Sequence, residues 1–199
     1  MKAPAMIARF APALGTALLL AGCVSFGEDP PDSLLTLTPT ATAAVGRDLS
    51  GSQQTALVLS EFEVPQSLDV TRVPVQVDDT SIAYLEDAMW VERPSRLFRR
   101  LMAETLRARS GRVVIDGDDP GVLATDRLTG SLRNFGYDAR TSSVVVTFDA
   151  VRGADGSDVR TRRFEARVDG VAPDVAAVGP ALNTAANQVA SEVADWVGQ

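Results

Sequence analysis

The sequence predicts an α+β fold in which a mostly antiparallel sheet packs against two main amphipathic helices, in a single domain behind a lipidated tether. Three observations predict it. Residues 94–111 and 174–196 repeat apolar side chains at helical spacing. Residues 126–168 contain three runs that alternate apolar with polar residues, as strands with one buried face do. An apolar content of 45% over 199 residues is enough for one core.

Residues 1–22 have the layout of a secretory signal peptide, and Cys23 follows them as a lipidation site. Lys2 and Arg9 are basic, and the apolar run 10–21 would rise only about 18 Å as a helix, too short for a ~30 Å hydrocarbon core. The segment Leu20-Ala21-Gly22-Cys23 matches the bacterial lipobox. Cys23 is the only cysteine, so it forms no internal disulfide, and we expect it to carry acyl chains that bind the membrane.

The predicted domain organisation is therefore a signal peptide over 1–22, a lipidated tether over 23–33 and a periplasmic domain over 34–199. Pro30-Pro31 stiffens the tether. At the start of the domain, residues 34–37 form a brief strand candidate that Pro39 closes. Residues 38–54, rich in Thr, Ala, Ser and Gly, indicate a loop.

Three extended segments come next. Residues 55–64 predict a strand that ends at Pro65. Residues 66–77 are extended but contain Pro74, which favours a sheet edge or an irregular connection. Residues 81–84 predict a further short strand.

Pro94 begins the first predicted helix, because proline at the first helical position costs no hydrogen bond, and Gly111 ends it. One face carries an apolar stripe, and the other carries five arginines: Arg96, Arg99, Arg100, Arg107 and Arg109. These arginines form either a solvated face or a contact for an acidic partner.

The carboxyl-terminal half predicts four strands and a helix. A short strand over 112–115 precedes an antiparallel meander over 126–138, 143–151 and 159–168, with a hairpin signal at 153–156. Asp174 can cap the last helix, whose stripe ends at Trp196. Because Pro180 lies inside this pattern, the helix is either kinked there or begins near Pro180 after a separate turn.

Charge and residue content exclude several classes of function. Removal of residues 1–22 takes away Lys2 and Arg9 but no acid, so 17 cations face 26 acids and the net charge is −9. This acidity disfavours nucleic acid as a partner. The chain has no histidine, and Cys23 is used by the anchor, so common bases, nucleophiles and zinc ligands are missing. We expect no enzyme activity, no metal and no cofactor.

Partner-contact candidates lie in connecting segments, where function tends to collect. They are Pro65, Leu68 and Arg72, in the irregular stretch, together with Trp90. An arginine can hold a carboxylate in bidentate geometry, and a tryptophan can anchor an interface. The alternative for Trp90 is that it covers the core beside Phe98.

In its order of motifs the chain resembles the ABC-type transport auxiliary lipoprotein family, which includes paraquat-inducible protein C. The resemblance rests on the lipobox and the segments 34–39, 65–72, 90–98 and 126–135, followed by the meander and the closing alanine-rich helix. Leu34-Leu35 stands where the family has paired tyrosines, and the connection between Arg72 and Trp90 also departs from the family pattern.

The resemblance implies a lipoprotein anchored in the outer membrane and facing the periplasm. It would serve as the auxiliary, docking subunit of a system made of an MCE-domain substrate-binding protein and an ABC transporter. That system moves phospholipid or another lipid between the two membranes. Val24 is not aspartate, so the usual inner-membrane retention signal of enteric bacteria is missing. A homo-oligomer is a further expectation from the resemblance. The alternatives are a lipid carrier and a regulator of cell-wall synthesis.

Overall fold

The structure is a computed structural model that describes residues 33–117, 124–154 and 158–199, which lie in one compact unit. Cys23, the predicted signal peptide and almost all of the predicted tether lie outside the described residues. The domain boundaries predicted at residues 22 and 33 therefore stay predictions. None of the described helices is long and apolar enough to cross a membrane.

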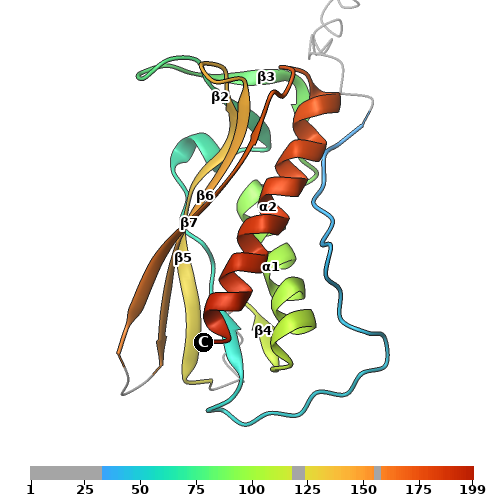
Figure 1. Ribbon diagram of the computed structural model, residues 1–199, viewed down its shortest axis with the longest axis vertical. Coiled ribbons are helices and arrows are strands. Elements are labelled where there is room, and N and C mark those ends of the chain that lie inside the picture. Colours follow the sequence, from blue (N-terminus) through green and yellow to red (C-terminus); the bar gives the residue numbers. More distant parts are fainter. Residues whose placement is uncertain (1–32, 118–123, 155–157) are drawn as a thin grey trace, which may run out of the picture. The chain divides into compact units, whose positions relative to one another are not determined.

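Two helices and a seven-stranded sheet make up the described part of the chain, which confirms the α+β class (Figure 1). The helices are α1 (Pro94–Ser110) and α2 (Val175–Val197), with a short 3₁₀ helix, η1 (Gln66–Leu68). The strands are β1 (Leu57–Leu59), β2 (Arg72–Gln76), β3 (Ile82–Met89), β4 (Val114–Asp116), β5 (Asp126–Asp138), β6 (Ser143–Ala154) and β7 (Arg160–Asp169).

Strand β5 is the centre of the sheet, and the sheet is mixed. Along one edge β5 pairs with β6 over its whole length, and β7 follows, which confirms the antiparallel meander. Along the other edge β5 pairs in parallel with β1 near its start and with β2 near its end. Parallel β4 extends β1, and antiparallel β3 extends β2. The sheet therefore forks on that side of β5.

The fork corrects the expectation that Pro74 confines its segment to a sheet edge or an irregular connection. Strand β2 lies between β3 and β5. Its pairing with β5 begins only at Val75, so the missing N–H of Pro74 removes no bond from that ladder. Strand β3 also runs on to Met89, well beyond the predicted end at residue 84.

A β-bulge in β5 explains which of its side chains are buried. The register shifts between Leu132 and Asn134, so Arg133 is the extra residue. Leu132 and Phe135 are both buried although strict alternation would place them on opposite faces. The rings of Phe135, Phe148 and Phe98 meet in the core, with Phe98 5.5 Å from Phe148 and 6.1 Å from Phe135.

The helices cover one face of this sheet. Helix α1 begins at Pro94 and ends before Gly111, whose φ of 64° suits glycine, as predicted. Helix α2 begins after Asp174, whose side chain accepts a hydrogen bond from the Ala177 N–H. It runs on through Pro180, so the alternative of a separate turn before a helix starting near Pro180 is wrong.

Several arginines of α1 form ion pairs with acidic residues of the same chain. Arg99 pairs with Asp116 at 2.5 Å, Arg100 pairs with Glu92, and Arg109 pairs with Asp195 of α2 at 2.7 Å. These pairs favour a structural role for this face over a contact with an acidic partner.

The segment before β1 forms a strap along the helices (blue in Figure 1). Of the strand expected at 34–37, only Leu35 makes a bridge, to Trp90. The Thr38 and Thr40 amides donate to the side-chain oxygens of Asn183 and Asn187 at 2.8 Å each. We call residues 34–43 the strap.

Candidate functional site

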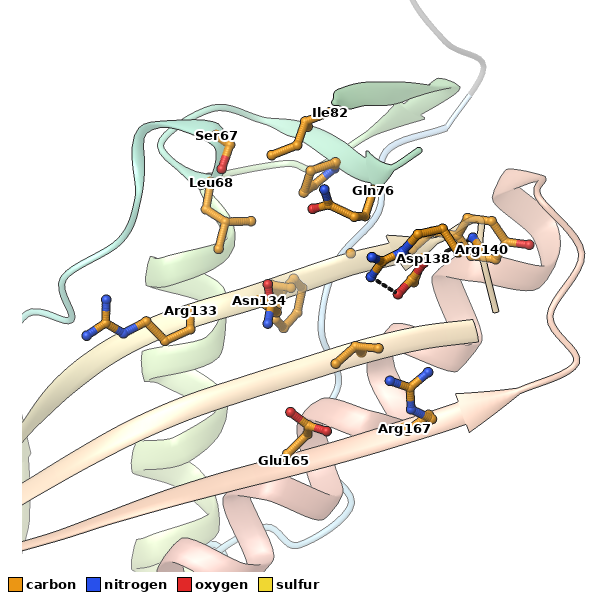
Figure 2. Close-up of a pocket in the computed structure, with 15 residues that line it drawn as sticks. Ser67, Leu68, Gln76, Ile82, Arg133, Asn134, Asp138, Arg140, Glu165 and Arg167 are labelled. Atoms are coloured by element: carbon orange, nitrogen blue, oxygen red, sulfur yellow. Dashed lines mark hydrogen bonds and ion pairs between the residues drawn. The ribbon is translucent and has the colours of Figure 1, made fainter. Parts of the chain in front are cut away.

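A groove lies on the face of the sheet that points away from the helices. In Figure 2 the helices lie behind the strands. The volume of the groove is about 190 Å³. We call it the outer groove, and its lining residues are Ser67, Leu68, Pro74, Gln76, Ile82, Arg133, Asn134, Phe135, Gly136, Tyr137, Asp138, Arg140, Val145, Glu165 and Arg167. They come from η1, from the β2–β3 pair and from β5, β6, β7 and the β5–β6 turn.

The fork of the sheet creates the outer groove. Residues 133–136 of β5 lie between the part paired with β1 and the part paired with β2. Helix η1, which follows Pro65, lies beside this opening and contributes Ser67 and Leu68. At Gly136 the backbone of β2 comes so close that an added Cβ would lie 2.3 Å from the Pro74 carbonyl oxygen. The groove therefore depends on a glycine at this position.

Asp138 and Arg140 form a charged pair at one end of the outer groove (Figure 2). The Arg140 guanidinium donates to both Asp138 carboxylate oxygens, at 2.9 and 2.8 Å, and also pairs with Asp79. These side-chain hydrogen bonds from Arg140 hold the pKa of Asp138 below its ordinary value, although burial opposes them. Both groups stay charged at neutral pH, and each already has its partner.

A second charged cluster crosses three strands beside the groove. Asp149 of β6 accepts from Arg163 of β7 at 2.6 and 2.8 Å, and from Arg133 of β5 at 3.0 Å. The hydrogen bonds from Arg163, followed by those from Arg133, lower the pKa of Asp149 to about 2. This cluster holds the bulged residue Arg133 in place.

Arg167 differs from the other arginines of the groove. Its guanidinium donates to the hydroxyls of Ser143 at 2.6 Å and Thr141 at 3.1 Å. Within the described residues, no carboxylate lies at ion-pair distance from it. The groove thus presents a positioned cation that an incoming carboxylate can satisfy with charge-assisted hydrogen bonds.

The structure brings only part of the predicted contact set to this groove. Leu68 lines it but is 2% exposed, and Pro65 is the exposed residue before η1. Arg72 is exposed, and its guanidinium lies 4.7 Å from the centre of the Tyr84 ring. Trp90 is 2% exposed, with its ring 5.5 Å from that of Phe135. That burial favours the alternative in which Trp90 covers the core.

Sequence reasoning missed the arginines of the groove. Arg133, Arg140 and Arg167 looked like ordinary polar positions of a meander. The available signal was the alternation in β7, where Arg163, Glu165 and Arg167 share the face opposite Phe164 and Ala166. The register of the strands decides which charged side chains find partners, and the sequence of a single segment does not encode this register. Among the described residues, no three potential metal ligands lie together.

Comparisons with known proteins match almost all of the described domain. A family model described as "ABC-type transport auxiliary lipoprotein component" matches residues 35–194. No curated protein matches the sequence.

Solved structures share the fold at low sequence identity. A Xanthomonas campestris protein assigned to the DUF330 family has a TM-score of 0.62 at 18% identity, covering 84% of this chain and 92% of its own. An uncharacterized protein also has a TM-score of 0.62, at 16% identity, with 76% and 96% covered. A PelC dodecamer from Paraburkholderia phytofirmans has a TM-score of only 0.42 at 13% identity, with 71% and 90% covered.

Proposed function

Because the chain belongs to the family of ABC-type transport auxiliary lipoprotein components, we propose that it docks an MCE-domain protein of a lipid-transport ABC system at the outer membrane. In this role the chain is held by acyl chains on Cys23 and faces the periplasm. It carries no catalytic step. The observation that carries the proposal is the family match over 35–194, which spans nearly the whole described domain.

The outer groove supports docking over lipid carriage. Drug-sized apolar ligands occupy pockets of roughly 300–1,000 Å³ with mostly apolar walls. The outer groove is smaller, at about 190 Å³, and three arginines and two carboxylates line it. Such a surface suits polar, oriented contact with a protein better than burial of an acyl chain.

A second groove is the one observation that favours a lipid carrier. It lies between the strap and α1, with a volume of about 410 Å³, and Leu37, Leu97 and Leu101 line it. Four charged side chains line it too, namely Arg100, Glu104, Arg107 and Asp116. Bringing these charges into contact with an acyl chain would cost solvation energy, so we rank carriage second.

Co-purification from detergent-solubilised membranes tests the docking role. The intact chain is compared with a control in which residues 1–33 carry an unrelated domain. We expect the MCE-domain protein to co-purify with the chain and not with the control. Recovery of peptidoglycan synthases alone would replace docking with cell-wall regulation. Stoichiometric phospholipid in the purified protein would favour carriage.

A further inference from the structure

Strand β7 presents a long, regular and free edge. All ten of its residues pair in register with β6, without a bulge. Among the described strands β7 has no other neighbour, and no described backbone group bonds to its second edge. In an antiparallel strand every second residue points its N–H and C=O away from the existing partner. The free edge therefore offers a row of unpaired donors and acceptors at strand spacing.

The other free edges of the sheet are poor templates. Strand β4 has only three residues. Strand β3 is irregular. Tyr84 pairs with Pro74 of β2, but the next paired residue of β3, Met89, pairs with Arg72, so β3 has extra residues between these two pairs. Asp87, one of these residues, has a φ of 53°. Short edge strands and bulges are devices that block the addition of another strand. Strand β7 has neither device.

Three arginines that form no ion pair within the described residues mark this same strand. The Arg160 guanidinium lies 5.1 Å from the Trp196 ring centre, and that of Arg162 lies 5.1 Å from the Phe164 ring centre. Arg167 is held by two hydroxyls. Within the described residues none of the three forms an ion pair. In a chain with more acids than bases, this leaves a local positive edge.

We propose that the β7 edge binds an extended, acidic segment of a partner protein, which adds to the sheet as a further strand. Backbone groups of the segment pair with β7. Carboxylates on one face of the segment reach Arg160 and Arg162 on the helix side of the sheet, and those on its other face reach Arg167 in the outer groove. The alternating donors and acceptors of the edge match a polypeptide, whereas a lipid headgroup would use the arginines alone. This inference deepens the docking function proposed above, on which it rests, by naming a surface and the chemistry of its partner.

The test measures binding of a labelled peptide of glutamate, valine and threonine to the full chain in detergent. Glutamate occupies both odd and even positions, so that carboxylates lie on both faces of the added strand. One control peptide has lysine for glutamate, and another has proline at its centre, which removes a ladder donor. We expect the acidic peptide alone to bind and to slow hydrogen exchange at the amides of β7. Equal binding of the proline peptide, or protection only outside β7, would overturn the proposal.

Charge-reversal variants distinguish binding of the peptide at the β7 edge from general electrostatic attraction between the peptide and the chain. The triple variant Arg160→Glu, Arg162→Glu, Arg167→Glu should weaken peptide binding by about tenfold or more, equivalent to ~1.4 kcal/mol. A matched triple, Arg47→Glu, Arg93→Glu, Arg96→Glu, changes the net charge equally but leaves β7 intact, and it should bind like the wild type. An equal loss in both triples would overturn the proposal.

Two further outcomes count against an acidic protein partner. Protection of β7 that rises with protein concentration, without peptide, would assign the edge to a second copy of the chain. Binding to phosphatidylglycerol vesicles that the β7 reversal abolishes would assign it to a lipid surface. If the MCE-domain protein co-purifies but the peptide does not bind, the docking function stands and the edge inference fails.

Discussion

At the residue scale, Asp126 joins several parts of the fold. It is 5% exposed and accepts from Arg112 at 2.7 Å, next to β4, and from Arg152 of β6 at 3.1 and 2.8 Å. Arg152 also donates to the Val197 carbonyl at the end of α2. Burial raises the pKa of Asp126, but the hydrogen bonds from Arg152 and Arg112 outweigh it, so the pKa is lowered.

The first prediction is that Asp126→Asn destabilises the fold in a pH-dependent manner. Because the folded pKa lies below the unfolded value of 3.8, the stabilisation is fully present above that value. It is lost as the pH falls through the folded pKa. Urea unfolding at pH 7 should show a loss of about 1–3 kcal/mol, since two half-buried cations lose their partner. The deficit should shrink below about pH 4.

A constant deficit at all pH values would contradict this reading of Asp126. The variant Asp48→Asn, which changes an exposed carboxylate, serves as the control.

Gly136 is the residue on which the outer groove depends. The Cβ of Gly136→Ala would lie 2.3 Å from the Pro74 oxygen and 2.9 Å from its Cγ, so β2 must move away from β5. We predict a loss of about 1–3 kcal/mol in unfolding free energy, measured by denaturant unfolding. Gly198→Ala, where the nearest atom lies 3.5 Å away, should be close to neutral. Equal stability of the two variants would show that β2 does not need this close approach.

At the element scale, the strap joins the tether to the folded body. Leu35 donates to the Met89 carbonyl at 2.7 Å and accepts from the Val91 N–H at 2.9 Å. Further along, the buried Asn187 side chain accepts from the Thr40 N–H and donates to the Thr38 carbonyl at 2.9 Å. The strap is therefore held at two points by residues far away in the sequence.

We predict that Asn187→Ala loosens the strap and leaves the sheet intact. The substitution leaves backbone groups of residues 38 and 40 without their partners, which costs about 1–3 kcal/mol. Hydrogen exchange at residues 36–43 should accelerate, while exchange in β5 and β6 stays slow. Thr184→Ala, on the exposed side of the same helix, provides the control. Unchanged exchange in the strap would show that Asn187 does not hold it.

The elements with local signals were predicted well, and those set by distant partners were not. Pro94 and Gly111 bound α1 as their backbone chemistry predicts, and the alternation in 126–168 gave the meander. The parallel pairs of β5 with β1 and β2 were missed, because a short strand carries no signal for its partner's direction. For the same reason Pro74 was expected at an edge or in an irregular connection, although β2 lies inside the sheet.

At the scale of the whole molecule, the outer groove shows where sequence reasoning ends. Its lining comes from residues 67–82, 133–145 and 165–167, which only the completed sheet brings together. The sequence singled out the neighbourhood of Leu68, because an irregular stretch after Pro65 is visible locally. Nothing in the sequence shows that Arg163 forms an ion pair while Arg167, among the described residues, does not.

The anchor is the other whole-molecule feature, and it rests on the lipobox before Cys23. We predict that the mature protein begins at Cys23 and carries three acyl chains, which bind a membrane far more firmly than one chain. Intact mass spectrometry of protein purified from membranes should show the acylated amino terminus. Cys23→Ser should leave the protein unacylated and unprocessed. A free Cys23 thiol in the wild type would contradict the anchor.

Photocrosslinking in living cells tests the docking function most directly. A photoreactive residue replaces Ser67 in the outer groove of the full chain, and a matched control carries it at Gln188, exposed on α2. We predict that the Ser67 position captures an MCE-domain protein of an ABC transporter and that the Gln188 position does not. Capture of only peptidoglycan synthases from Ser67, or equal capture from both positions, would contradict docking through the outer groove.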